Sequence, residues 1–295
     1  LYLEVFELPE NGPEGFSEEF YSFDYGDAHI TVLNSWVFSG EQNLTEAELA
    51  ALDKWVARDL ADCDARWKIV VTHIPIYAVH SDGTSVTARE RWTPIFEKYG
   101  VTLMLVGHQH VYSRLSPLTD GVPDYEDGVT QIMGNSGQKF YSSADETLAE
   151  RTIYNTATYQ LARVDGDKLT VQTFDIDGNE LDFTELRPRV SAPLTRGEFI
   201  GEYFTDGVLL GYGGGELGLQ DVITSEQIVT LLWRAAGSPK TDCDARDLET
   251  VSEWAAEAWA WALADVLPGG GLSPGETPNR SLVLEILKHY GGTGQ

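Results

Sequence analysis

Three histidines follow two apolar runs of the chain, at positions where they could bind metal ions together. His73 follows the run at 67–72, and His108 and His110 follow the run at 101–106. Because sites gather at the carboxyl ends of neighbouring strands, we expect these imidazoles to meet at one sheet edge. Neutral imidazoles suit zinc, iron or manganese, and two cations about 3.5 to 4 Å apart can bind phosphate oxygens and activate a hydroxide. The alternative is that all three are ordinary residues at strand ends.

Four polar or aromatic side chains flank these histidines. His80 lies on the loop after His73, where it could donate a proton to a leaving alkoxide, and an exposed loop histidine is the open alternative. Tyr77 and Arg114 could line the same pocket and contact substrate, although packing is the commoner role for Tyr77 and Tyr112. We therefore take His80 as the candidate catalytic residue and Tyr77 and Arg114 as candidate substrate-binding residues.

Several other residues that could do chemistry are interpreted as structural. His29 falls in an expected strand and His289 on an expected tail helix, so both are taken as structural or solvent-exposed. Asn135 lies in the segment GNSG, which we interpret as a turn. Cys63 and Cys243 lie in different halves of the chain, outside any Cys-x-x-Cys pair, and are expected to be unpaired.

The elements that must position the histidines alternate between strands and helices. A hairpin is expected around Gly26 and Asp27, and Thr45 with Glu48 forms a capping box that begins a helix. Apolar spacing then predicts strands at 21–26, 29–35, 67–73 and 101–110 and helices at 44–60 and 88–100. This alternation is typical of an α/β fold.

The second half of the first domain has an all-β pattern. Its expected strands lie at 130–137, 158–164, 167–175 and 178–186, with turns at Asp165-Gly166 and Asp177-Gly178. They should form a closing sheet rich in hairpins. The proline-containing stretch 186–196 interrupts this pattern, so we place a domain boundary near Pro188, between domains at 1–187 and 188–295.

The tail repeats itself and is expected to be a small helical array. The segment 224–237 aligns without gaps to 278–291, and a shorter copy begins at 195. Each complete copy follows a glycine-rich turn, and a tryptophan-rich amphipathic helix at 252–267 separates them. The pattern predicts a small all-α domain.

Composition narrows the classes of function. The formal net charge of -27, from 47 acidic and 20 basic residues, repels polyanions, so nucleic acid is not an expected partner. No apolar run approaches the roughly 20 residues of a membrane-spanning helix. The chain begins at Leu1, in what reads as the middle of a strand, which suggests that a longer polypeptide precedes it.

Two segments carry a resemblance to a known family. VTHIPIY at 71–77 and VGHQHVYSR at 106–114 resemble the last two metal motifs of calcineurin-like metallophosphoesterases, and their aromatic continuation is similar to the purple acid phosphatases. The resemblance implies a partial metallophosphoesterase β-sandwich with flanking helices over 1–187. It also implies hydrolysis of phosphate esters by two divalent or trivalent ions (Fe, Zn or Mn), with His73 and His108 on one ion and His110 on the other.

The family's earlier motifs are missing from this sequence. Its members also use an Asp-x-His motif, a Gly-Asp segment and a Gly-Asn-His segment, which supply carboxylate and further ligands ahead of the region matched here. Without a bridging carboxylate, three imidazoles should bind two metals poorly. We therefore expect the C-terminal half of a catalytic domain, with activity in the longer parent and none in this chain alone.

The tail resembles the S-layer homology domain of bacterial surface proteins. In that family an arginine near the start of the helix helps to bind acidic cell-wall polysaccharide, and this chain has Arg196 and Arg280 in the matching places but Ser225 in the third. The resemblance implies an extracellular, wall-associated protein. Arginines that only cap or solvate the helices are an equal alternative, and a non-catalytic cell-wall binding module is the rival function.

Overall fold

The protein is described by a computed structural model that divides into two compact units, residues 1–192 and 193–295. The division follows Ala192, whereas the sequence analysis placed it after residue 187. The residues that the structure describes are 2–63, 65–189, 194–203, 218–241, 248, 250–265, 272–278, 283, 286–287 and 290.

A seven-stranded mixed sheet forms the centre of the first unit, in the order β1-β2-β3-β4-β8-β5-β9. Strands β2, β3, β4 and β8 run parallel, whereas β1, β5 and β9 are antiparallel to their neighbours. The strands are β1 (Tyr21–Tyr25), β2 (Ala28–Leu33), β3 (Trp67–Thr72), β4 (Val101–Val106), β5 (Tyr112–Leu115), β8 (Thr130–Met133) and β9 (Ala149–Ile153). The parallel pairing of β3 with β4 brings their carboxyl ends to one edge.

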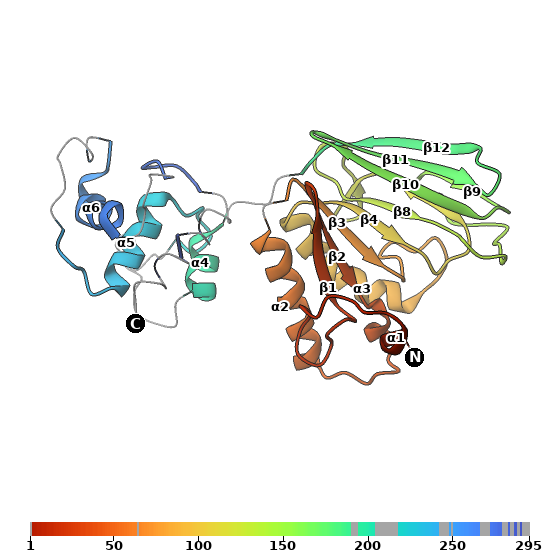
Figure 1. The fold of residues 1–295 in the computed structure, drawn as a ribbon, viewed down its shortest axis with the longest axis horizontal. Helices are drawn as coiled ribbons and strands as arrows, with labels where there is room; N and C mark the ends of the chain where they lie inside the picture. The colour runs from red at the N-terminus through yellow and green to blue at the C-terminus, as the bar shows by residue number, and fades with distance from the viewer. Residues whose placement is uncertain are drawn as a thin grey trace. The chain divides into compact units, whose positions relative to one another are not determined.

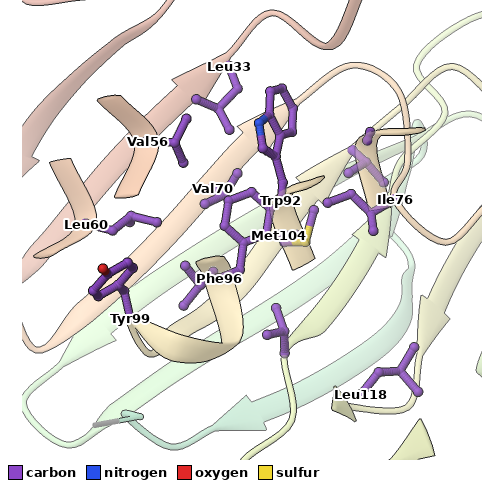
Figure 2. Close-up of a cluster of buried hydrophobic side chains, with 14 of the residues drawn as sticks. Leu33, Val56, Leu60, Val70, Ile76, Trp92, Phe96, Tyr99, Met104 and Leu118 are labelled. Atoms are coloured by element: carbon purple, nitrogen blue, oxygen red, sulfur yellow. The ribbon is translucent and has the colours of Figure 1, made fainter. Parts of the chain in front are cut away.

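Two helices cover one face of this sheet (Figure 1). Helix α2 (Glu46–Asp62) begins with the expected capping box, in which Thr45 and Glu48 each bond the other's backbone N–H. Helix α3 (Gly83–Lys98) begins five residues before the predicted start, because Asp82 caps it. Figure 2 shows the core between these helices and the sheet, where Val56, Leu60, Trp92 and Phe96 pack against strand residues such as Val70 and Met104.

A three-stranded antiparallel sheet covers the opposite face (Figure 1). It consists of β10 (Thr158–Asp165), β11 (Lys168–Asp175) and β12 (Glu180–Leu186). Ile69 and Leu103 of the central sheet share a buried cluster with Leu169 and Val171 of β11. Since Ile69 and its neighbour Val70 face opposite sides of β3, the central strands are buried on both faces, as their continuous apolar runs indicated.

Two expectations for the first unit are wrong. The segment at 130–137 does not join the closing hairpins: β8 inserts into the central sheet between β4 and β5. The chain does not open in a strand either, because α1 (Tyr2–Val5) is one helical turn. The remaining short elements are η1 (Ser35–Phe38), β6 (Leu118–Thr119) and β7 (Val122–Pro123).

The second unit is helical where it is described. It contains α4 (Arg196–Tyr203), α5 (Ser225–Ala235), η3 (Glu253–Ala255) and α6 (Ala256–Asp265) around a core that includes Phe199, Ile228 and Trp259. Two of the aligned copies begin with the same reciprocal bonds, between Thr195 and Glu198 and between Thr224 and Gln227. Most of the third copy lies outside the described residues. No helix in the described ranges has the length and apolar character needed to cross a membrane.

Candidate metal centre

His73 and His108 meet at the edge where β3 and β4 end. The Gly107 N–H donates to the His73 carbonyl at 2.9 Å, which extends the pairing of the two strands past their last residues. The two imidazole rings lie edge to face, with centroids 5.2 Å apart and planes at 80°. His73 is exposed and the His108 side chain is 33% exposed, so both rings are open to solvent rather than sealed in the core.

His108 has an unusual backbone and a carboxylate partner. Its φ of 67° lies in the left-handed region, which costs a non-glycine residue of the order of 1 kcal/mol and is often found at functional sites. Its Nε2 lies 3.0 Å from Oδ2 of Asp82. Asp82 was not among the residues predicted from the sequence. Its position before Gly-Thr-Ser is an N-cap signature that could have marked it.

His110 and His80 both contact the ring of Tyr141. The His110 and Tyr141 ring centroids are 5.4 Å apart, and those of His80 and Tyr141 are 4.5 Å apart. The Tyr141 N–H also donates to the His110 carbonyl at 2.8 Å, and His80 Nε2 lies at hydrogen-bond distance from the Ser143 carbonyl. The segment 141–143 therefore joins the loop after β3 to the turn after β4.

Two buried glutamines hold the loop that carries His80. Gln131 Oε1 accepts from the N–H groups of Ile76 and Tyr77, while its Nε2 donates to the Tyr77 carbonyl. Gln109 makes the same three bonds one step further along, to the N–H groups of Val79 and His80 and to the His80 carbonyl. Each glutamine amide therefore makes the backbone hydrogen bonds that a neighbouring strand would make, because no strand lies beside this part of the loop.

The electrostatics of the cluster favour neutral imidazole at His73. Although His73 is exposed, neighbouring protein atoms displace part of the water around its ring, and this desolvation, together with positive charge on His108 and on His110, lowers the pKa of His73 below its usual value. A neutral ring keeps a lone pair, which is the state that binds a metal.

Arg114 is not brought to the histidines, contrary to the sequence prediction. Its guanidinium bonds both carboxylate oxygens of Asp182 on β12, at 2.8 and 3.1 Å, and also pairs with Glu150. Tyr112 is buried and donates its hydroxyl proton to Asp182 at 2.8 Å. These side chains link the two sheets, because alternate residues of β5 face the second sheet.

Tyr77 also has structural contacts. Its ring packs against the helix-side core and lies 5.7 Å from the Arg89 guanidinium, while burial and the nearby charge of Glu97 raise the pKa of its hydroxyl. Asn135 is buried and organises its own loop, where its side chain donates to the Lys139 carbonyl and accepts from the Gly137 N–H. The interpretation of GNSG as a turn-forming segment agrees with these bonds.

The remaining candidates lie away from this cluster or outside the described residues. His29 is a buried residue of β2, and Cys63 carries a free thiol. Arg196 is only 5% exposed, so its guanidinium is not displayed at the surface as a glycan contact requires. Arg280, His289 and Cys243 lie outside the described residues.

The residue types in the cluster suit a metal ion, but too few of them converge to hold one. Imidazole nitrogens suit zinc, iron or manganese. However, over the described ranges no three or more histidine, cysteine, aspartate or glutamate side chains converge closely enough to hold a metal ion. Asp82, which contacts His108, already uses both carboxylate oxygens in other bonds. The residues present do not by themselves fit a complete two-ion centre.

A cavity of about 630 Å³ opens beside His73. Its lining includes Val32, Val71 and Leu105, which are in register on β2, β3 and β4, and also Gly107. These three side chains are only partly buried, although neighbouring residues of the same strands are fully buried. The edge that carries the histidines is therefore continuous with an apolar hollow.

Comparison with known proteins gives a consistent result for this region. Residues 4–112, which include the three histidines, match the family described as calcineurin-like phosphoesterase. An acid phosphatase of Aspergillus ficuum is 31% identical over 156 residues, which cover 40% of this chain and 25% of that protein. Purple acid phosphatase 23 of Arabidopsis thaliana is 26% identical over 141 residues, 46% of this chain and 29% of that protein.

Among solved structures, the purple acid phosphatase PPD1 of yellow lupin aligns with a TM-score of 0.47 and 19% identity, over 62% of this chain and 34% of that one. The chain spans about a quarter to less than half of the length of the curated relatives it matches. Residues 4–112 of the first unit are therefore similar to calcineurin-like phosphoesterases, and the relatives that match this chain include acid and purple acid phosphatases.

Proposed function

We propose that this chain supplies three imidazole ligands, His73, His108 and His110, to a dinuclear centre that hydrolyses phosphate esters. The observation that carries the proposal is the meeting of His73 and His108 at one solvent-open sheet edge, with ring centroids 5.2 Å apart. The names of the relatives, acid phosphatases and purple acid phosphatases, favour phosphate monoesters as substrates.

We propose that the remaining ligands of the centre come from outside the residues that the structure describes. The described residues supply imidazoles but no group of three or more side chains that could hold an ion. The proposal therefore includes a negative expectation: this chain alone is inactive. Within the assembled site, His80 is the proposed proton donor to the leaving group, because its ring and that of His110 both contact Tyr141. Tyr77 and Arg114, held by other contacts, are not part of it.

The test compares this chain with a longer form of the same protein. Bound zinc, iron and manganese and the turnover of p-nitrophenyl phosphate are measured for both, with each metal supplied. We expect metal binding and turnover in the longer form, and loss of both in its His73→Ala and His108→Ala variants. His289→Ala, which removes an imidazole from the other unit, is the matched control. A longer form that binds metal but never turns over substrate would favour the rival function, a non-catalytic wall module.

For the tail we propose attachment to an acidic cell-wall polysaccharide and hence an extracellular, wall-associated location. The support is the internal repeat and the shared helix start of its first two copies. Because Arg196 is buried, we propose that Arg280 makes the contact with the glycan. Co-sedimentation of the chain with purified cell wall should be strong for the natural protein and weak for Arg280→Ala. Equal sedimentation of the two would assign the arginine a structural role.

A further inference from the structure

An apolar cavity lies at the carboxyl ends of β2, β3 and β4, beside His73. Its volume of about 630 Å³ falls in the range of about 300 to 1,000 Å³ that is typical of small-molecule sites, and ligands of open α/β sheets bind at this end of the strands. The in-register side chains of Val32, Val71 and Leu105 line it from the sheet. The cavity therefore has the size and the place of a ligand site.

Two residues outside the sheet add to the apolar lining. Leu3 of α1 is 46% exposed and Trp36 of η1 is 41% exposed. The Trp36 Nε1 donates to the Glu41 carboxylate at 3.1 Å, a bond that restrains the indole ring. Exposed apolar patches mark interaction sites, and an indole packs well against another aromatic ring, either stacked or edge to face. The lining thus favours an aromatic ligand.

The lining of the cavity carries little charge. Among the described residues that form it, Glu19 is the only acidic one and none is lysine or arginine. The Glu19 carboxylate already accepts a hydrogen bond from the Asn34 side chain at 2.6 Å. A charged group enclosed by this lining would lack an opposite charge, and burying it would be costly. The part of the ligand inside the cavity is therefore uncharged.

One buried polar group of the lining lacks a partner. Thr72 is 4% exposed, and its hydroxyl makes no hydrogen bond with any of the described residues. Most buried hydroxyls are hydrogen-bonded, because an unpaired one costs free energy. An oxygen atom of a ligand next to Thr72 supplies the missing partner.

We propose that this cavity binds an aryl alcohol or the aryl group of its ester, with the ring against Trp36 and Val71 and the oxygen beside Thr72. Binding of the alcohol needs no metal ion. The purpose of the site rests on the proposed phosphoesterase function: in an aryl phosphate, this alcohol is the leaving group, and the phosphate lies on the His73 side. The three lining residues then determine which esters the site prefers.

The first test measures binding of 2-naphthol and of naphthalene to the metal-free chain by equilibrium dialysis. We expect one molecule of either compound per chain. Trp36→Ala removes a wall of the cavity and should weaken the binding of both about 10-fold. Thr72→Val removes only the hydroxyl, so it should weaken 2-naphthol about fivefold and leave naphthalene unchanged. An equal effect of Thr72→Val on the two compounds contradicts the contact with the ligand oxygen.

A matched control and a second variant make this test independent of folding defects. Phe183 of β12 is 50% exposed and is not part of the cavity lining, so Phe183→Ala should leave the binding of both compounds unchanged. Val71→Thr keeps the shape of the side chain and should weaken naphthalene about 10-fold. Circular dichroism and urea unfolding check that each variant is folded. Full affinity in folded Trp36→Ala and Val71→Thr, or an equal loss in Phe183→Ala, overturns the proposal.

The second test compares kcat/KM of the longer form for 2-naphthyl phosphate and for ethyl phosphate. The ratio of the two values should fall about 10-fold in Trp36→Ala, because the intrinsic reactivity of each ester cancels between natural form and variant. An unchanged ratio in an active enzyme overturns the role in substrate choice. If the longer form binds 2-naphthol but hydrolyses neither ester, the proposed function fails and the ligand site stands. If the longer form does not bind 2-naphthol, polypeptide covers the cavity and the ligand assignment is wrong.

Discussion

At the scale of single residues, His29, which is not a candidate metal ligand, forms a buried charged cluster with two carboxylates. His29 is 6% exposed, and its Nδ1 and Nε2 lie 2.7 Å from Asp24 and 3.1 Å from Asp59. Because carboxylates only accept, both ring nitrogens must carry hydrogen, which makes the ring an imidazolium. Burial lowers the pKa of His29, but the hydrogen bonds and charges of Asp59 and Asp24 outweigh it and raise the pKa above its usual value.

This raised pKa predicts a stability that depends on pH. The contribution of His29 is complete below the unfolded-state pKa of about 6.5 and is lost as the pH rises through the folded-state pKa. His29→Gln should therefore lower the free energy of unfolding by on the order of 2 kcal/mol at about pH 6 and by less at about pH 9. Urea unfolding at both pH values measures the difference.

The two carboxylates provide an internal comparison for that experiment. Asp59 is 12% exposed at its side chain and also accepts from Ser22 and Thr31, whereas Asp24 is 73% exposed. Exposed charges contribute little because water screens them. Asp59→Asn should thus destabilise the protein much more than Asp24→Asn. An effect of His29→Gln that is equal at both pH values would contradict the imidazolium.

At the scale of elements, the loop between β3 and α3 depends on side-chain hydrogen bonds for its order. Gln109 is 3% exposed and bonds the backbone of residues 79 and 80, so its removal leaves buried polar groups without partners. Gln109→Leu should cost about 1–3 kcal/mol of unfolding free energy. Hydrogen exchange should accelerate at the amides of Val79 and His80.

The second glutamine supplies the matched control for this loop. Gln131 holds Ile76 and Tyr77 independently, so exchange at those two amides should change little in Gln109→Leu. Gln109→Glu retains the acceptor for both N–H groups and should protect Val79 and His80 better than leucine does. Uniform acceleration over residues 76–80 would mean that the loop opens as one unit instead.

At the scale of the whole first unit, a polar link crosses between the two sheets. Asp182 of β12 accepts from Arg114 and from the Tyr112 hydroxyl, both on β5. Burial raises the pKa of Asp182, but the bonds from Arg114 and Tyr112 outweigh it and hold the pKa below its usual value. The link therefore stabilises the fold above about pH 4 and is lost as the pH falls through the folded-state pKa.

Replacing Asp182 should weaken the polar link between the two sheets. It removes no ligand of the candidate centre. Asp182→Asn leaves the Arg114 charge only partly compensated and should cost about 2 kcal/mol near neutral pH, with a smaller cost below about pH 3. Chemical unfolding at the two pH values measures this. Unchanged stability at neutral pH would show that Glu150 alone satisfies the arginine.

The sequence by itself determined the local structure and part of the site. Apolar periodicity and short-range bonds operate within a few residues. They account for helix α2 and its cap, the β1–β2 hairpin and the strands before His73 and His108. The meeting of the two histidines was also predictable, because neighbouring parallel strands end at the same edge.

The tertiary structure alone decided the partners of the polar side chains. Arg114 follows a metal motif in sequence yet faces Asp182, 68 residues away, because strand alternation turns it toward the second sheet. Gln109 and Gln131 were missed because their partners belong to other segments of the chain, and no local pattern records such pairs. Asp82 has a local N-cap signature, but its contact with His108 is long-range and has no local pattern. The insertion of β8 beside β4 has the same origin, since strand order depends on long-range pairing rather than on the residues of one strand.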